Sequence, residues 1–404
     1  MPNISLTEIQ AANERIAPYI RKTPLLAFEA LSQRSEKNIL LKCENLQRTG
    51  SFKIRGAANC ILLNLDRAKK VGVVTASAGN HAQAVAAVCH RLGIKATVVM
   101  PATTPTIKVV NTQKWGATIK LVGAVYDDAF VHAMELSKAE GFLYIHPFRD
   151  TKIMAGQGTI ALELVEDPAF KDVEAVVVSL GGGGLISGVG NAIKALRPEI
   201  KVYGVAAKNA PATWRTFKEN KPATDEIIYT LAEGVAAKKS DDFMLGYLKG
   251  CVDDVFTIHE EAIAHAIALL AEHGKMVVEG AGALPVAAII EKLIPEKNIA
   301  LVISGGNIDL PTFSQVLQRG LAEQGRLVRL VITIPDRPGG LLSITQVLAE
   351  QRANILQIFH QRATLKTGIG ETEVEVDLET KGREHTEEIT RLLVERGFRV
   401  HCDS

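Results

Sequence analysis

The chain has 404 residues, of which 47% are hydrophobic and 5% aromatic, and its formal net charge is +1. This length exceeds what one hydrophobic core usually spans, so we expect a large α/β part with a further domain. The nearly neutral charge and the few aromatic residues argue against a protein that binds nucleic acid or an anionic membrane surface.

The N-terminal segment Ser5-Leu6-Thr7-Glu8 predicts a capping box at the start of a helix, and no signal peptide is visible before it. The uncharged stretch 175–193 is long enough to span a membrane, but four glycines in its middle favour a strand, a loop and a helix start. The cysteines are scattered without C-x-x-C spacing, which argues against a disulfide framework or a zinc site and predicts a cytoplasmic protein. They are Cys43, Cys60, Cys89, Cys251 and Cys402.

Short hydrophobic runs alternate with helical patterns over the first three quarters of the chain. This alternation predicts right-handed βαβ units and parallel sheets, and the uninterrupted run at 175–180 predicts a sheet covered on both faces. We therefore expect an α/β catalytic domain over 1–323, with a smaller subdomain at about 54–150. The predicted strands are 72–77, 96–101, 118–123, 142–146, 175–180, 201–207 and 299–304, and the helices include 80–92, 127–140 and 186–196.

The pattern changes near residue 325, where a helix predicted over 311–323 stops at a glycine. A compact βαββαβ pattern follows and predicts a separate α+β domain over 327–404. Its predicted elements are a strand at 328–334, a helix at 341–351, strands at 354–362 and 370–378, a helix at 384–396 and a strand at 398–401.

Four segments with unusual composition, 50–57, 77–81, 181–185 and 304–307, follow predicted strands. Ligands of parallel α/β sheets bind at the carboxyl ends of the strands, so these segments are expected to form one site. In the run Gly181–Gly184 several backbone N–H groups can converge on an anion at a helix start, which predicts a phosphate site. No G-x-G-x-x-G register, acidic ribose ligand or Gly-Lys-Ser/Thr sequence accompanies it, which argues against a dinucleotide or Walker loop.

Single residues of these segments also have simpler interpretations. Lys53 alone fits a solvated charge at a helix start, Asn80 fits an N-cap, and Ser304 fits a polar residue in a Gly-Gly turn. His81 fits a packed or solvated helix residue, and we assign it no chemistry. The four segments in this order carry the functional interpretation, not any residue alone.

Taken together, Ser51-Phe52-Lys53-Ile54-Arg55-Gly56-Ala57 and the other three segments resemble the pyridoxal-phosphate-dependent threonine/serine dehydratase family of fold type II. The resemblance covers about residues 5–320 and implies a two-subdomain parallel-sheet fold like that of the tryptophan synthase β chain. It implies that pyridoxal phosphate forms a Schiff base with Lys53. It further implies cofactor contacts from Phe52 on the ring face, Asn80 on the phenolic oxygen, Ser304 on the pyridine nitrogen, and Gly181, Gly182, Gly183, Gly184 and Leu185 on the phosphate.

The resemblance also implies a β-elimination in which Lys53 removes the α-proton, so that threonine gives 2-oxobutanoate or serine gives pyruvate, with ammonia. The substrate carboxylate is expected on Ser77, Ala78, Gly79, Asn80 and His81. Racemases of this type carry a serine where this chain has Ala78, which favours a dehydratase. Serine or 3-hydroxyaspartate dehydratase or racemase, a β-replacement synthase, and a non-catalytic sensor or nicotinamide enzyme are the alternatives. We expect a homodimer or homotetramer.

Residues 327–404 resemble an ACT domain, an amino-acid-sensing module, and a purely structural dimerisation domain is the alternative. The resemblance implies that an amino acid such as isoleucine or valine regulates the enzyme there, which suits isoleucine biosynthesis. The implied effector residues are Asp336, Pro338, Gly339, Gly340 and Leu341. Relatives often have an acidic residue where this chain has Ala206-Ala207. Some relatives bind a cation near the segment that matches Glu233, and we leave the metal unassigned.

Overall fold

The computed structural model describes residues 2–226, 228–361 and 368–403, and its contacts divide the chain into two compact units, 1–308 and 309–404. The first helix, α1 (Leu6–Ile16), begins as predicted. Ser5 is its N-cap, and the reciprocal Ser5 and Glu8 bonds of the capping box are present. Because Ile9, Ala12 and Ile16 recur on one face of α1, that face is buried in the first unit.

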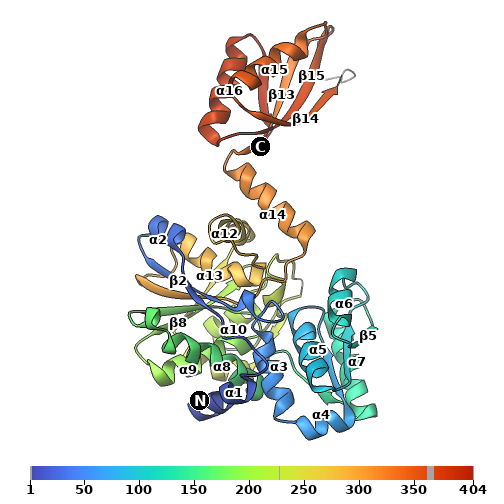
Figure 1. Ribbon diagram of the computed structural model, residues 1–404, viewed down its shortest axis with the longest axis vertical. Coiled ribbons are helices and arrows are strands. Elements are labelled where there is room, and N and C mark those ends of the chain that lie inside the picture. Colours follow the sequence, from blue (N-terminus) through green and yellow to red (C-terminus); the bar gives the residue numbers. More distant parts are fainter. Residues whose placement is uncertain (1, 227, 362–367, 404) are drawn as a thin grey trace. The chain divides into compact units, whose positions relative to one another are not determined.

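The larger sheet of the first unit has six strands in the order β1-β2-β12-β7-β8-β11. Only β1 runs antiparallel to its neighbour, and the remaining pairs are parallel. Every residue of β7 is buried, as expected for a sheet covered by helices on both faces (Figure 1). The strands are β1 (Leu25–Ala27), β2 (Asn38–Cys43), β12 (Asn298–Ile303), β7 (Ala175–Ser179), β8 (Lys201–Ala207) and β11 (Asp254–Ile258).

The smaller sheet of the same unit has four parallel strands in the order β5-β4-β3-β6. Helices α5 and α7 pack against its central strands, and α6 packs against α5 (Figure 1). The two parallel sheets confirm the predicted α/β fold with parallel-sheet subdomains. The elements are β3 (Val73–Ala76), α5 (Asn80–Leu92), β4 (Ala96–Met100), α6 (Thr106–Gln113), β5 (Thr118–Leu121), α7 (Tyr126–Glu140) and β6 (Leu143–Tyr144).

Most predicted elements have counterparts in the structure, with shifted ends. The strand predicted over 142–146 is reduced to β6, because the chain turns after Ile145 and the His146 ring accepts the next backbone N–H groups. The helix predicted from 186 begins earlier, at Gly184. Strands β1, β2 and β11 had no prediction, since β1 is short and the others lie outside the regular alternation.

The remaining elements of the first unit connect the two sheets and cover the larger one. Helix α3 packs against α5 and α8, and α8 packs against α9, so this helix layer links the subdomains. These elements are α2 (Glu29–Ser35), η1 (Glu44–Leu46), α3 (Lys53–Leu62), α4 (Leu65–Val71), α8 (Thr151–Glu166), η2 (Pro168–Phe170), α9 (Gly184–Leu196), α10 (Ala212–Glu219), β9 (Ala223–Thr224), η3 (Glu233–Val235), β10 (Lys239–Ser240), α11 (Asp242–Cys251), α12 (Glu260–Glu272) and α13 (Gly280–Ile290).

The second unit contains a four-stranded antiparallel sheet in the order β14-β15-β13-β16. Alternate residues of β13 and β15 are buried against α15 and α16 (Figure 1). The sequence assigned helix α14 to the catalytic domain, but by its contacts it belongs to this unit, since it packs against β13. The elements are α14 (Leu310–Glu323), β13 (Leu327–Pro335), α15 (Gly340–Glu350), β14 (Asn354–Gln361), β15 (Glu371–Glu379), α16 (Arg383–Glu395) and β16 (Arg399–Asp403).

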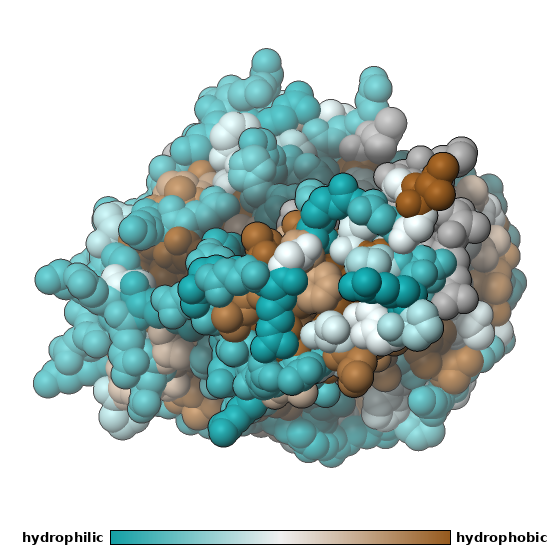
Figure 2. Space-filling model, turned by 90° about the horizontal axis from the view of Figure 1, so that it is seen from above, coloured by the Kyte–Doolittle hydropathy of each residue, from teal (hydrophilic) through white to brown (hydrophobic). Residues whose placement is uncertain are grey.

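Position 362, the predicted end of one strand, lies outside the described residues. Across the described part of the chain, no helix combines the length and apolar character needed to cross a bilayer. Hydrophilic side chains cover most of the face in Figure 2, with hydrophobic residues scattered between them. Leu342 and Leu356 are examples of exposed hydrophobic side chains on separate elements, α15 and β14.

Candidate active site

The start of α3 is held directly against the end of β12. Ser51 forms an antiparallel bridge with Gly305, and the Phe52 N–H donates to the Ser304 carbonyl at 3.0 Å. The Gly306 N–H donates in turn to the Gly50 carbonyl at 2.8 Å. Residues about 250 positions apart in the sequence are therefore adjacent, and Lys53, the first residue of α3, is carried to this junction.

Lys53 lies where a reactive amine is expected. Its Nζ donates to the Pro147 carbonyl at 3.1 Å and stands 5.2 Å from the centroid of the Phe52 ring. Burial lowers the pKa of Lys53 from 10.5 to about 8, and the Glu279 carboxyl partly opposes this shift. Since a Lys53 amine with this pKa is partly neutral near physiological pH, it can act as a nucleophile or base.

The glycine run 181–184 joins β7 to the start of α9. Gly183 adopts φ +85°, a left-handed conformation that favours glycine, and it is the N-cap of α9. A Cβ on Gly182 would lie 2.6 Å from the Phe148 ring, and one on Gly181 would lie 2.7 Å from the Val235 backbone. The run thus has a packing reason that the sequence did not reveal, besides the free N–H groups of a helix start.

Asn80, the first residue of α5, takes part in a side-chain network. Its Nδ2 donates to Glu279 Oε1 at 2.7 Å, and its Oδ1 accepts from Asn307 Nδ2 at 2.7 Å. Burial raises the pKa of Glu279 to about 7, against the opposing influence of Asn80, Lys108 and Lys53. Sequence reasoning missed Glu279, because it follows no predicted strand and belongs to no motif.

The 77–81 segment forms a turn into the N-terminus of α5. Gly79 N–H donates to Ser77 Oγ at 3.2 Å, while Ala78 and Gly79 remain partly exposed. His81 is buried, and its Nε2 donates to the Ile145 carbonyl at 3.1 Å. Burial first, and then the nearby Lys53 charge, lower the pKa of His81 to about 3. A neutral His81 that holds a backbone carbonyl is a packed residue, consistent with the absence of an assigned chemical role.

His146 is a second neutral histidine beside the candidate site. Its Nδ1 accepts from the Phe148 and Arg149 N–H groups at 3.2 and 2.9 Å, which places the ring proton on Nε2. Burial and the Lys53 charge lower its pKa to about 4. The His146 ring meets that of Phe148 edge to face at 4.9 Å, so it supports the residue that packs on the glycine run. It ends a predicted strand, but no signal marked it as functional.

Ser304 follows β12 and is only 3% exposed. Its backbone carbonyl holds the start of α3, as described above, so its hydroxyl belongs to the same junction as Lys53. A hydroxyl at this position can exchange a hydrogen bond with a ligand but cannot supply a negative charge.

The described residues give no support for a metal site. Glu233, which the sequence left open as a cation ligand, forms an ion pair with Lys108 of α6. Within 2–226, 228–361 and 368–403, no group of three or more His, Cys, Asp or Glu side chains is arranged to hold a metal ion.

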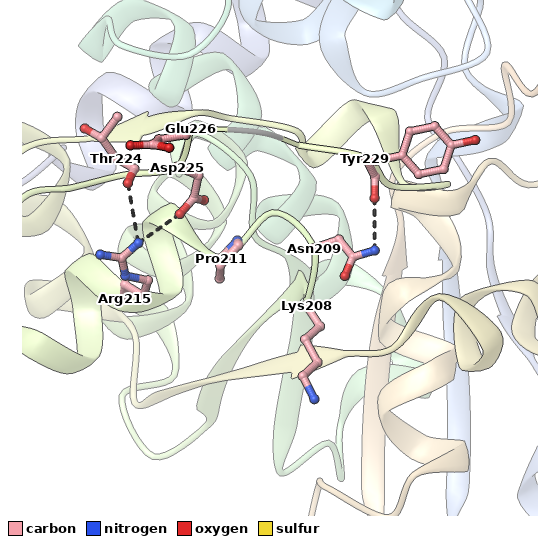
Figure 3. A pocket seen from close by; sticks show the side chains of 8 residues that line it. All are labelled: Lys208, Asn209, Pro211, Arg215, Thr224, Asp225, Glu226 and Tyr229. Carbon is pink, nitrogen blue, oxygen red and sulfur yellow. Dashed lines mark hydrogen bonds and ion pairs between the residues drawn. The ribbon is translucent and has the colours of Figure 1, made fainter.

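A separate pocket of about 620 Å³ follows the end of β8. Ala206 and Ala207 are buried there, and the next residues, Lys208 and Asn209, line the pocket. Its charged groups are largely used by each other, since Arg215 pairs with Asp225 at 3.0 Å, as Figure 3 shows. None of the predicted site residues lines this pocket, so it is distinct from the junction around Lys53.

Comparisons with known proteins agree with this geometry. The family model described as "Pyridoxal-phosphate dependent enzyme" matches residues 16–305. An L-threonine ammonia-lyase of Thermotoga maritima is 43% identical over 98% of this chain and 99% of its own length. One of Geobacter sulfurreducens is 41% identical over 98% of each chain.

Solved structures show the same likeness over the first part of the chain. A threonine deaminase from the organism abbreviated T.th. superposes with a TM-score of 0.72 at 38% identity, over 76% of this chain and 99% of the other. Serine racemase from Dictyostelium discoideum gives 0.71 at 34% identity, also over 76% and 99%.

Proposed function

The chain belongs to the family of pyridoxal-phosphate-dependent enzymes, and we propose that it is a threonine ammonia-lyase. It converts L-threonine to 2-oxobutanoate and ammonia, and L-serine to pyruvate. The observation that carries the proposal is the end-to-end similarity to two L-threonine ammonia-lyases, at 43% and 41% identity. A buried lysine with a lowered pKa among the family's motif segments supports it.

The residues around Lys53 fit pyridoxal phosphate. The Lys53 amine would carry the aldehyde, and the N–H groups at the start of α9, from Gly181 to Leu185, suit its phosphate. The Phe52 ring beside the amine, the buried Ser304 hydroxyl and the Asn80 amide suit the two faces and the polar edge of an aromatic ring. When bound, this cofactor supplies the electron withdrawal that makes the α-hydrogen of an amino acid acidic.

The chain's own residues would bind the substrate and move its proton. N–H groups at the start of α5 suit the α-carboxylate, and Ser77 Oγ, which accepts from Gly79, orders that turn. The neutral Lys53 amine removes the α-proton, and the Pro147 carbonyl 3.1 Å away helps to orient it. Ala78 has no side-chain proton to deliver from the turn, which favours elimination over racemisation.

The experiment is a 2-oxo-acid assay across threonine, serine and 3-hydroxyaspartate, with borohydride reduction and peptide mapping of the cofactor-loaded protein. Threonine should be the best substrate, and the reduced cofactor should be attached to Lys53. A label on another residue would overturn the site, and preference for serine or 3-hydroxyaspartate would overturn the substrate. Lys53→Ala serves as the control for both measurements.

We also infer that the C-terminal unit is an ACT-like regulatory domain that binds an amino acid such as isoleucine or valine. Its βαββαβ order and the turn at 336–341 support this inference. Gly339 has φ +92° with open space around a would-be Cβ, and α15 starts at Gly340, so N–H groups near Asp336, Pro338 and Leu341 face a free turn. Equilibrium dialysis with isoleucine and valine, before and after Gly339→Val, tests it; binding of neither would remove the idea.

Three further inferences accompany this function. We infer domain limits of 1–323 for catalysis, with a smaller subdomain near 54–150, and 327–404 for regulation. We infer a homodimer or homotetramer, which light scattering would test. A cytoplasmic location is supported by the buried, unpaired thiols of Cys43, Cys60, Cys89 and Cys251.

A further inference from the structure

Asn80 is held in one orientation by two neighbours that no motif includes. We propose that Glu279, together with Asn307, is a positioning residue that fixes the Asn80 amide, so that its second hydrogen is directed to the ligand beside Lys53. This inference rests on the cofactor placement proposed above and extends it to residues outside the four motif segments.

The hydrogen bonds determine which way the Asn80 amide points. Its Oδ1 accepts from Asn307 Nδ2, and its Nδ2 donates to the Glu279 carboxylate, both at 2.7 Å. Rotating the amide by 180° would set two donors against each other at Asn307 and two acceptors against each other at Glu279. An amide nitrogen carries two hydrogens, so one remains after the bond to Glu279.

Asn307 is itself held firmly. Its Nδ2 also donates to the Thr49 carbonyl at 2.8 Å, which uses both of its amide hydrogens. A Cβ on Gly50 would collide with the Asn307 side chain, so the glycine that precedes the Lys53 segment leaves room for this contact. The orientation of Asn80 is therefore coupled to the chain segment that carries Lys53.

Glu279 is directed to the same point from a third segment. Its N–H donates to the Gly305 carbonyl at 3.1 Å, and the Asn307 N–H bonds its carboxylate. A Cβ on Gly305 would collide with Glu279 Oε1, so this glycine makes room for the carboxylate. Although Glu279 is the N-cap of α13, its side chain makes no capping bond, and helix capping does not account for it.

The electrostatic surroundings suit this task. The Glu279 carboxyl lies near the positive charges of Lys53 and Lys108, and burial brings its pKa to about 7. A charged acceptor forms a stronger and more directional hydrogen bond with an amide than a neutral one does. Glu279 would act through Asn80 and need not touch the cofactor.

The test compares Glu279→Gln and Glu279→Ala with Glu291→Gln, the same isosteric change on an exposed glutamate at the other end of α13. Pyridoxal phosphate affinity is measured by equilibrium dialysis, and the position of the absorbance band reports the cofactor's hydrogen bonding. We expect roughly tenfold weaker binding and a shifted band in Glu279→Gln, a larger loss in Glu279→Ala, and no change in Glu291→Gln. Should Glu279→Ala fail to fold by circular dichroism, Glu279→Gln decides.

A double-mutant cycle separates positioning from a general structural role. If Glu279 acts through Asn80, the effect of Glu279→Gln disappears in an Asn80→Ala background, and additive effects would contradict the proposal. Borohydride labelling of the wild-type protein keeps the two levels apart. Labelling of Lys53 with unchanged affinity and spectrum in both Glu279 variants would overturn this inference alone, whereas absence of that label would overturn the proposed function.

Discussion

The two units of the chain treat charge in opposite ways. In the first unit, Arg55 is fully buried and pairs with Glu44 and Glu163, both at 2.7 Å, and Lys42 also pairs with Glu163. In the second, Arg329 pairs with Asp377 at 2.6 Å on a sheet face where the arginine is 42% exposed. The difference shows that parallel sheets covered on both faces must neutralise their polar groups internally, whereas water screens those of an open antiparallel sheet.

The same contrast applies to the places where ligands are expected. The site of the first unit is assembled from segments scattered over the chain, and its lysine and carboxylate have pKa values shifted by burial. The turn at 336–340 in the second unit is local and open. Substitutions should therefore have large, coupled effects in the first unit and small, separate ones in the second.

Loss of the reactive amine is expected to have the largest effect. Lys53→Ala should lower 2-oxo-acid formation by more than about 1000-fold, because the base is removed, while the buried contacts of α3 remain. Kinetics and circular dichroism check this. Retention of more than a few per cent of activity would show that another group takes the proton.

Arg55→Ala should destabilise the first unit by about 3–5 kcal/mol, because it leaves Glu44 and Glu163 buried without their partner. Urea denaturation followed by tryptophan fluorescence checks this, since Trp115 and Trp214 both lie in this unit. Arg55→Lys, which keeps a charge but loses the planar fork, should fall between the two proteins. A loss below about 1 kcal/mol would mean that water reaches these carboxylates.

Attachment of pyridoxal phosphate to the apoprotein should depend on pH through Lys53. Because its pKa is about 8, the neutral amine becomes scarcer below that value, and the attachment rate should fall about tenfold per pH unit. Above about pH 8 the rate should level off. Stopped-flow absorbance between pH 6 and 9.5 checks this, and a rate that keeps rising to pH 9.5 would show that burial does not lower the lysine pKa.

Gly182→Ala should weaken cofactor binding by roughly tenfold, since the new methyl group would lie 2.6 Å from the Phe148 ring and displace the loop. Equilibrium dialysis measures the loss. The penalty should shrink in a Phe148→Ala background, where the ring is absent. An equal penalty in both backgrounds would assign the requirement for glycine to the backbone alone.

The smallest effect is expected in the second unit. Arg329→Ala should cost no more than about 1 kcal/mol, because solvent screens its pairs with Asp377 and Glu375. Denaturation followed by circular dichroism, with Asp377→Asn as the matched change, would measure it. A loss near that of Arg55→Ala would remove the contrast between the two units.

The fold was largely predictable because its signals are local. The uninterrupted hydrophobic run of β7, the capping box at Ser5 and the period-2 alternation in β13 each depend on neighbours within a few residues. The short strand β1 escaped prediction, since three residues carry too little pattern. The two parallel sheets therefore followed from the sequence, and several element ends did not.

The candidate site divides in the same way. The glycine run 181–184 and Lys53 stood out because of their own composition and their place after strands. Glu279 and Asn307 did not, because they lie 199 and 227 positions from Asn80 and are partners only in three dimensions. Pro147, whose carbonyl accepts from Lys53, was hidden for the same reason.

By itself, the sequence determined the class of fold, the order of its elements and the segments rich enough in special residues to form a site, since each of these depends on short-range pattern. Only the tertiary structure decided how Asn80 is oriented and how far burial shifts the pKa values of Lys53 and Glu279. Hydrogen-bond partners and desolvation depend on which distant segments pack together, and local pattern does not encode that packing.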